Sequence, residues 1–234
     1  MTPGEKSGKR AMYFIGITGG VGAGKSEILS CLEQIPDVIV VRADELAREL
    51  MQPGEICYSK IAEVFSTEGV FDESGRLIPE KMSRQIFSDE HKRRIANGIV
   101  HPAVKDRILQ MVQSAREQGR VRLFFLEAAL LLEEGYDRLC DELWYIYAGE
   151  ATRRKRLMQS RGYSDARITG ILNSQMKEEV FRKRCQRIID NDGELWIAKE
   201  QVQGFVRELL ESEDGSGKNH QQKPQERQIK EKKR

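Results

Sequence analysis

The sequence is poor in the residues that hold metals or build disulfide frameworks. Its four cysteines form no Cys-x-x-Cys pair, and it has only three histidines, which argues against a zinc site. Few, scattered cysteines in a chain of 234 residues are typical of reduced, structural thiols. We therefore expect a cytoplasmic protein.

Long apolar runs are also missing. The most apolar stretch, Leu123 to Leu132, is interrupted by Glu127 and is far shorter than a membrane span. The polar segment from Met1 to Arg10 is not followed by an apolar one, so we expect no secretory signal. These absences argue against a membrane partner.

The net charge of +2 is unevenly distributed. From Lys218 onward there are seven lysines and arginines and two glutamates, a net +5 that leaves −3 for the rest of the chain. Residues 211–234 have almost no large apolar side chains, so we expect a disordered basic tail, and we expect residues 1–11 to be flexible. The tail is either solvated or a contact for nucleic acid or an anionic surface, and the first interpretation is favoured.

The sequence does contain a complete phosphate-binding loop. Gly19 to Ser26 read GGVGAGKS, which fits the pattern GxxxxGK[ST]. The apolar run Tyr13–Thr18 precedes the loop, and helical spacing follows from Ser26 to Gln34. The alternative, a glycine-rich turn with a chance lysine, does not explain this strand–loop–helix context.

The loop residues predict nucleoside triphosphate binding. Glycines let backbone N–H groups point at an anion, and the positive end of the following helix faces the same anion. Lys25 would reach the β- and γ-phosphates, and the Ser26 hydroxyl would hold Mg²⁺. The predicted nucleotide-binding residues here are Gly19, Gly20, Val21, Gly22, Ala23, Gly24, Lys25, Ser26 and, through its backbone N–H, Glu27.

Short apolar runs predict the rest of a parallel sheet. They alternate with helical patterns, which is typical of strands buried on both faces. Together they predict an α/β fold, a P-loop NTPase-type doubly wound parallel sheet of about five strands. The predicted strands after the first are Val38–Val41, Val121–Leu126, Leu143–Tyr147 and Arg187–Ile189.

Two segments are too long for simple crossovers. Residues 44–118 hold only helical patterns and predict an inserted helical subdomain that binds the second substrate; its last helix is predicted over Pro102–Gln118, with Pro102 in the first turn. Residues 152–185 are rich in arginine and broken at Gly162–Asp165, which predicts two short basic helices that form a lid. The domain over residues 12–210 would then have a core of residues 12–43, 119–151 and 186–210.

Asp44 follows the second predicted strand. Ligands of open parallel sheets bind at the carboxyl ends of the strands, so this carboxylate should face a transferred phosphate. It would accept the proton of an attacking hydroxyl. The alternative is a helix cap for Glu45–Met51, and both roles are compatible.

The segment TRRKRLMQSRG contains Arg153, Arg154, Arg156 and Arg161. Guanidinium groups on a lid would neutralise the charge of a phosphoryl group in transfer, whereas the alternative is a solvated helix face. Neighbours on a helix point in different directions, so we expect Arg156 and either Arg153 or Arg161 to reach the site.

Two residues keep open interpretations. His101 lies at the predicted helix start and either binds an acceptor's phosphate or ribose or serves only as an N-terminal residue of the helix. Glu127 ends the third predicted strand, where it is either an acid linked to the metal or a buried residue at a helix start.

The motifs together resemble the dephospho-CoA kinase family. GITGGVGAGKS, VVRADELARELMQPGE, IVHP, ALLLEEGYD, RRKRLMQSRG and IIDNDG follow in that family's order over about residues 13–210. The resemblance implies transfer of the ATP γ-phosphate to the ribose 3′-hydroxyl of dephospho-CoA, with ATP, Mg²⁺ and small-molecule substrates. It implies catalytic roles for Asp44, Lys25 and Arg156, and a place for Asn191 near the adenine. His101 would lie in the acceptor-binding subdomain, and Arg161 belongs to the arginine-rich lid motif. We expect Asp44, His101 and Arg161 to contact the substrate.

Four positions depart from the family's pattern. Glu27 replaces a threonine, Ala129 a proline, Pro79 an arginine, and Arg42 the first carboxylate of a DxD pair. Because Asp44, Lys25, Ser26 and Arg156 are kept, we expect an active kinase.

Two alternative functions follow from the same residues. One is another P-loop kinase that acts on a nucleoside monophosphate or a hydroxy acid. The other is a non-catalytic ATP-binding protein with a nucleic-acid-binding tail. The sequence has no NKxD guanine-specificity motif, which argues against a GTPase switch.

Overall fold

The computed structural model describes residues 12–214, so the predicted flexible start and all but four residues of the predicted tail lie outside it. Within the described part, five parallel strands form one sheet in the order β2-β3-β1-β4-β5. Each predicted strand is found, with ends that differ by at most two residues, and the P-loop NTPase-type α/β fold is confirmed. The strands are β1 (Tyr13–Thr18), β2 (Val38–Arg42), β3 (Leu123–Glu127), β4 (Glu142–Tyr147) and β5 (Arg187–Asp190).

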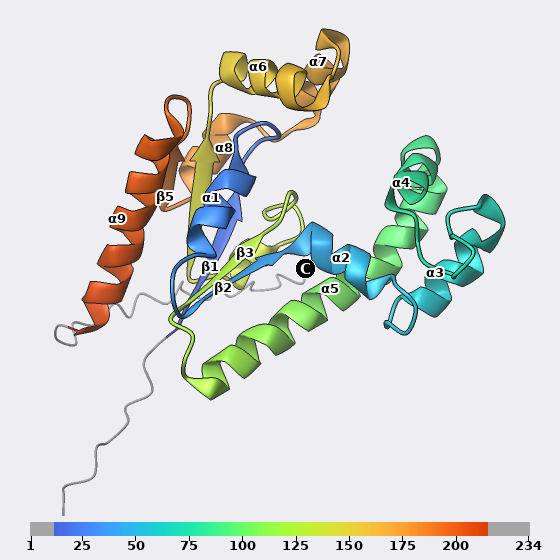
Figure 1. Ribbon diagram of the computed structural model, residues 1–234, viewed down its shortest axis with the longest axis horizontal. Helices are drawn as coiled ribbons and strands as arrows, with labels where there is room; N and C mark the ends of the chain where they lie inside the picture. The colour runs from blue at the N-terminus through green and yellow to red at the C-terminus, as the bar shows by residue number, and fades with distance from the viewer. Residues whose placement is uncertain (1–11, 215–234) are drawn as a thin grey trace, which may run out of the picture.

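The sheet is buried on both faces, which explains the nearly continuous apolar strands. Alternate side chains of β1 enter two different core clusters, Phe14 one of them and Ile15 and Ile17 the other. The Phe14 face packs against the second half of α5 (Glu90–Gln118) and α8 (Glu178–Arg184). The opposite face packs against α1 (Lys25–Leu32) and α9 (Leu195–Asp214) (Figure 1).

The segment between β2 and β3 forms the predicted helical lobe beside the sheet (Figure 1). Buried side chains of α3 and the following loop, including Ile61, Phe65 and Val70, fill its interior. The second half of α5 covers the sheet, so the predicted subdomain boundary at residue 118 is wrong and this helix belongs to both units. The lobe consists of α2 (Ala43–Leu50), α3 (Tyr58–Phe65), η1 (Ser66–Glu68), α4 (Pro79–Ser88) and the first half of α5.

The predicted helix start at Pro102 is wrong. The helix α5 begins at Glu90, and the Asp89 carboxylate caps it by accepting hydrogen bonds from the N–H groups of His91 and Lys92. Pro102 lies inside the helix, where it lacks the N–H that would bond to the carbonyl of Gly98. Buried residues one turn apart on both sides of the proline, such as Val100 and Val104, keep the helix on the core.

Three helices, not the two predicted, lie between β4 and β5. The arginine-rich helix α6 (Glu150–Arg161) and α7 (Asp165–Ser174) lie beyond the C-terminal ends of the strands (Figure 1). The break between them is confirmed, because the Ser164 hydroxyl caps α7. The third helix, α8, belongs to the sheet layer, since Phe181 stacks on Tyr145 with ring centroids 4.9 Å apart.

The helix α9 continues to Asp214, so the predicted end of the domain at residue 210 is four residues too early. Every helix within residues 12–214 is too short or too polar to cross a membrane.

Candidate active site

The loop between β1 and α1 has the geometry of an anion cradle. Gly22 and Gly24 have φ angles of 83° and 86°, a left-handed region that side chains other than glycine rarely adopt. Gly24 caps α1, which begins at Lys25, one residue earlier than predicted. The side chains of Ser26 and Glu27 are exposed in the first turn, and the backbone N–H groups of that turn have no carbonyl partner within the helix.

Lys25 lies under the loop and pairs with Glu127. Its ammonium donates a hydrogen bond to the Gly19 carbonyl at 2.8 Å and lies 3.6 Å from Glu127 Oε1. Burial lowers the pKa of Lys25 and raises the pKa of Glu127, and their mutual attraction opposes both shifts. Glu127 is buried at the end of β3 and pairs with Lys25 of the phosphate loop. No helix begins directly after β3, so Glu127 is not at a helix start, and its link to a metal stays a prediction.

Asp44 lies in the first turn of α2, not at its N-cap. Arg42 occupies the cap position, so the helix-cap interpretation of Asp44 is wrong. The carboxylate is exposed, and its negative charge is near enough to raise the pKa values of both Lys25 and Glu127. Asp44 therefore lies on the part of the helical lobe that faces the phosphate loop.

A cavity of about 450 Å³ opens next to Asp44. Its walls are α2, α4, the middle of α5 and the segment after β3, and most of the lining side chains are apolar. His101 lines the cavity, and its Nδ1 lies 3.0 Å from Glu134 Oε2. His101 is thus a side chain of the middle of α5, not a helix start, and Glu134 holds it in place.

Two lid arginines contact the phosphate loop. Arg153 donates from Nε to the Val21 carbonyl at 2.9 Å, and a Cβ on Gly20 would lie 2.5 Å from its Cζ. Arg156 donates to the Ala23 carbonyl of the loop at 3.4 Å and to the backbone carbonyl of Asn191 at 2.9 Å. Burial lowers the pKa of Arg153. These two residues are three apart on α6 and share one face.

The other two arginines of α6 lie elsewhere. Arg154 pairs with Glu150 and Asp165, both at 2.8 Å. Arg161, which we predicted as a substrate contact, is exposed, and its guanidinium lies 5.9 Å from the centre of the Tyr163 ring. Within residues 12–214, Arg161 makes no hydrogen bond or ion pair with the phosphate loop, whereas Arg153 does. The substrate contact of Arg161 stays a prediction.

Asn191 joins the end of β5 to the loop. Its side chain is 1% exposed, and its Nδ2 donates to the Ala23 carbonyl at 2.7 Å. A Cβ on Gly24 would lie 2.3 Å from this nitrogen, so only glycine fits at that position. The structure therefore brings Asn191 against the predicted nucleotide-binding residues.

The departures from the family pattern have visible consequences. Arg42 is bonded to Glu33 at the end of α1 and lies 3.9 Å from Glu45, so it points away from the cavity. Pro79 is the first residue of α4, where proline fits, and it lines the cavity together with Ala129. Glu27 is exposed beside the loop.

Sequence reasoning left the importance of Glu127 and Arg153 undecided and missed the partner of His101. Spacing did carry part of the signal, because Arg153 and Arg156 lie three residues apart on a helix. The pairing of His101 with Glu134 joins residues 33 positions apart, and no local pattern reports it.

Known proteins that are similar to this chain include dephospho-CoA kinases, the family that its motifs resemble. A family model described as dephospho-CoA kinase matches residues 13–196. A dephospho-CoA kinase of Symbiobacterium thermophilum is 33% identical over 204 residues, 87% of this chain and 84% of that protein. Another from Bacillus anthracis is 33% identical over 193 residues, 82% of this chain and 95% of the relative.

Solved structures share the fold. A crystal structure from Thermus thermophilus aligns with a TM-score of 0.67 and 27% identity, and covers 86% of this chain and 99% of its own. A dephospho-CoA kinase from Campylobacter jejuni aligns with a TM-score of 0.65 and 21% identity, over 85% of this chain and 98% of its own, a likeness of fold. Since the family model spans most of the chain, from the phosphate loop to the end of the lid and β5, this protein belongs to the dephospho-CoA kinase family.

Proposed function

We propose that this protein transfers the γ-phosphate of ATP to the ribose 3′-hydroxyl of dephospho-CoA, giving coenzyme A and ADP. Membership of the family supports this reaction and this acceptor. The observation that carries the proposal is the position of Asp44, whose carboxylate lines the cavity and acts electrostatically on Lys25 of the loop. Transfer to an alcohol needs a proton acceptor between the triphosphate and the acceptor.

The triphosphate would bind at the first turn of α1. Backbone N–H groups from Gly20 to Glu27 would donate to its oxygens, except that of Ala23, which already donates to the Gly20 carbonyl, and the helix N-terminus adds a favourable field. Lys25 would exchange its bond to the Gly19 carbonyl for a phosphate oxygen, while Glu127 keeps the ammonium in position. Arg153 and Arg156 already lie against the loop and would bind the same phosphates from α6.

The donor set fits a magnesium ion that is held mainly by the nucleotide. Within residues 12–214 there is no cluster of three or more histidine, cysteine or acidic side chains that would form a closed metal site. The exposed Ser26 hydroxyl would be the protein ligand, and phosphate oxygens and waters would supply the remaining ligands. The ion would neutralise charge on the phosphates in transfer.

The chemical step is a displacement at the γ-phosphorus. Asp44 accepts the proton of the 3′-hydroxyl while that oxygen forms the new bond to phosphorus. The bond from phosphorus to the bridging oxygen of ADP breaks, and ADP leaves with that electron pair. Lys25 and the two lid arginines would stabilise the negative charge on the oxygens of the transferred group.

The cytoplasmic location stays part of the proposal. It is supported by the four cysteines, which are all free in the described structure. The reaction uses no residue of the basic tail, so we do not propose a nucleic-acid partner.

A coupled assay of ADP release tests the function directly. The protein is given ATP, Mg²⁺ and one acceptor at a time: dephospho-CoA, several nucleoside monophosphates, or a shikimate-like hydroxy acid. We expect turnover with dephospho-CoA alone. Release of ADP with a different acceptor and none with dephospho-CoA would support the alternative small-molecule kinase, and no release with any acceptor would support the non-catalytic alternative.

A further inference from the structure

The cavity has only one permanently cationic side chain among the described residues that line it. The other charged or titratable lining residues are Asp44, Tyr136, Glu134 and His101, and the last two bind each other. Arg48 makes no ion pair or hydrogen bond with any described residue. An arginine in this position has its full set of donors available to a ligand.

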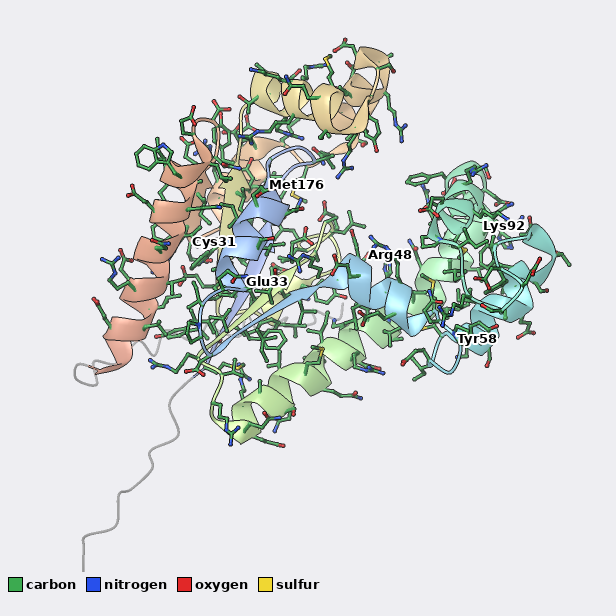
Figure 2. The ribbon with its side chains drawn as sticks, in the orientation of Figure 1. Cys31, Glu33, Arg48, Tyr58, Lys92 and Met176 are labelled. Carbon is green, nitrogen blue, oxygen red and sulfur yellow. The ribbon has the colours of Figure 1, made fainter. Side chains whose placement is uncertain are left out.

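Arg48 and Asp44 lie on the same face of α2. They are four residues apart, which places their Cβ atoms about 6 Å from each other. The two side chains nevertheless form no ion pair, although both line the cavity. Figure 2 labels Arg48 on α2, between the sheet and the rest of the helical lobe.

The geometry points to Arg48 as the residue that binds the diphosphate of the acceptor and thereby orients its hydroxyl toward Asp44. This inference rests on the proposed function, because the acceptor there carries both a ribose hydroxyl and a diphosphate. A guanidinium binds phosphate oxygens bidentately. The Asp44 carboxylate and the Arg48 guanidinium, one helical turn apart, therefore match a hydroxyl and a nearby phosphate on one acceptor. The apolar walls formed by α4 and α5 would take an uncharged part of the acceptor.

Arg48 also has a simpler interpretation. It lies in the last turn of α2, where a positive charge stabilises the helix through its dipole. That role needs charge but no bidentate geometry, and it predicts an effect on stability without an effect on acceptor binding. The test below separates the two roles.

The experiment measures the Kd of dephospho-CoA by calorimetry, together with kcat/KM for both substrates and the melting temperature. In Arg48→Met we expect the Kd of dephospho-CoA to rise about 10- to 100-fold while the KM of ATP stays unchanged. Arg48→Lys should recover only part of this loss, because an ammonium keeps the charge and lacks the fork. As the salt concentration increases, the Kd of dephospho-CoA should also rise more steeply for the wild type than for Arg48→Met.

Arg94→Met is the matched control. Arg94 is an exposed arginine of the same lobe, on α5, that does not line the cavity. We expect it to bind dephospho-CoA like the wild type. A Kd in Arg48→Met within about twofold of the wild type, full recovery in Arg48→Lys, or an equal loss in Arg94→Met would each overturn the inference.

The results that would contradict the proposed function differ from those that would contradict only the role of Arg48. If the wild-type protein neither binds dephospho-CoA nor releases ADP with it, the assigned acceptor is wrong, and the role of Arg48 is overturned with it. If the wild type binds and turns over dephospho-CoA and Arg48→Met does the same, only the role of Arg48 is wrong.

Discussion

The proposed role of Asp44 as proton acceptor can be tested by replacing one oxygen of its carboxylate with an amide nitrogen. Asp44→Asn keeps the size of the side chain and removes its ability to take a proton, so we expect kcat to fall by roughly 10²-fold or more. The affinity for ATP should not fall, because no hydrogen bond or ion pair joins Asp44 to the described loop residues and its negative charge, which acts on Lys25, does not help to bind an anion. Steady-state kinetics with dephospho-CoA and a direct measurement of ATP binding check both expectations.

Glu49→Gln is the control for this variant. Glu49 is an exposed carboxylate on the same helix that does not line the cavity, so its loss should leave kcat unchanged. If Asp44→Asn turned over as fast as Glu49→Gln, Asp44 would be an ordinary residue of a helix first turn.

Glu127 makes the free energy of unfolding depend on pH in the opposite direction to a carboxylate that caps a helix. Burial raises its folded-state pKa above the unfolded value of 4.5. Between these two pKa values the folded protein binds more protons, so the free energy of unfolding falls as pH rises. The free energy of unfolding of the wild type minus that of Glu127→Gln, measured in urea titrations, should therefore decrease as the pH rises above 4.5.

Asp89→Asn provides the opposite sign in the same experiment. Hydrogen bonds from the backbone N–H groups of Lys92 and His91 lower the pKa of Asp89 below 3.8. Its stabilisation is present above pH 3.8 and is lost as pH falls toward the folded pKa, so this difference should increase as pH rises. A flat difference for Glu127→Gln would show that its carboxylate is not desolvated.

At the scale of elements, the loop between β1 and α1 depends on a contact from β5. In Gly24→Ala the new methyl group would meet Asn191 Nδ2, and the backbone would keep an unfavourable positive φ. We expect a loss of stability of about 1–3 kcal/mol and weaker ATP binding, measured by urea unfolding and calorimetry. Adding Asn191→Ala should not restore ATP binding, because the strain in φ remains.

Gly204→Ala is the matched glycine variant. Gly204 lies in α9, where an added Cβ meets no atom within 4 Å. Alanine should stabilise the protein there by about 0.5–1 kcal/mol and leave ATP binding unchanged. Equal effects at the two glycines would contradict the packing of Asn191 on the loop.

Local patterns predicted the elements that depend on local physics. The β-branched and aromatic runs located all five strands, and the glycine loop located the start of α1, because strand burial and left-handed turns leave signals within a few residues. Pro102 gave a false helix start, since proline is usual in a first turn but tolerated inside a helix that tertiary contacts hold. The choice between Arg153 and Arg161 needed the orientation of α6, which is set by packing across the strand ends.

At the scale of the molecule, the two groups that would act on the phosphate come from different units. Asp44 comes from the lobe side, whereas Arg153 and Arg156 come from α6 on the opposite side of the loop. The elements carrying them, α2 and α6, lie apart in Figure 1. A nucleotide bound at the loop would contact α6 directly, and an acceptor would contact α2, so each substrate should order a different unit.

This arrangement predicts that ATP alone protects the lid. A non-hydrolysable ATP analogue with Mg²⁺ should slow proteolysis at the turn Gly162–Ser164 and near Gln175, because Arg153 and Arg156 would bind the phosphates and hold α6. Limited proteolysis followed by mass spectrometry measures this protection. Arg153→Met should reduce it, whereas Arg116→Met, at the far end of α5, should not. Cleavage rates in the lid that are the same with and without the analogue would mean that α6 is already fixed before nucleotide binds, and that the lid does not close.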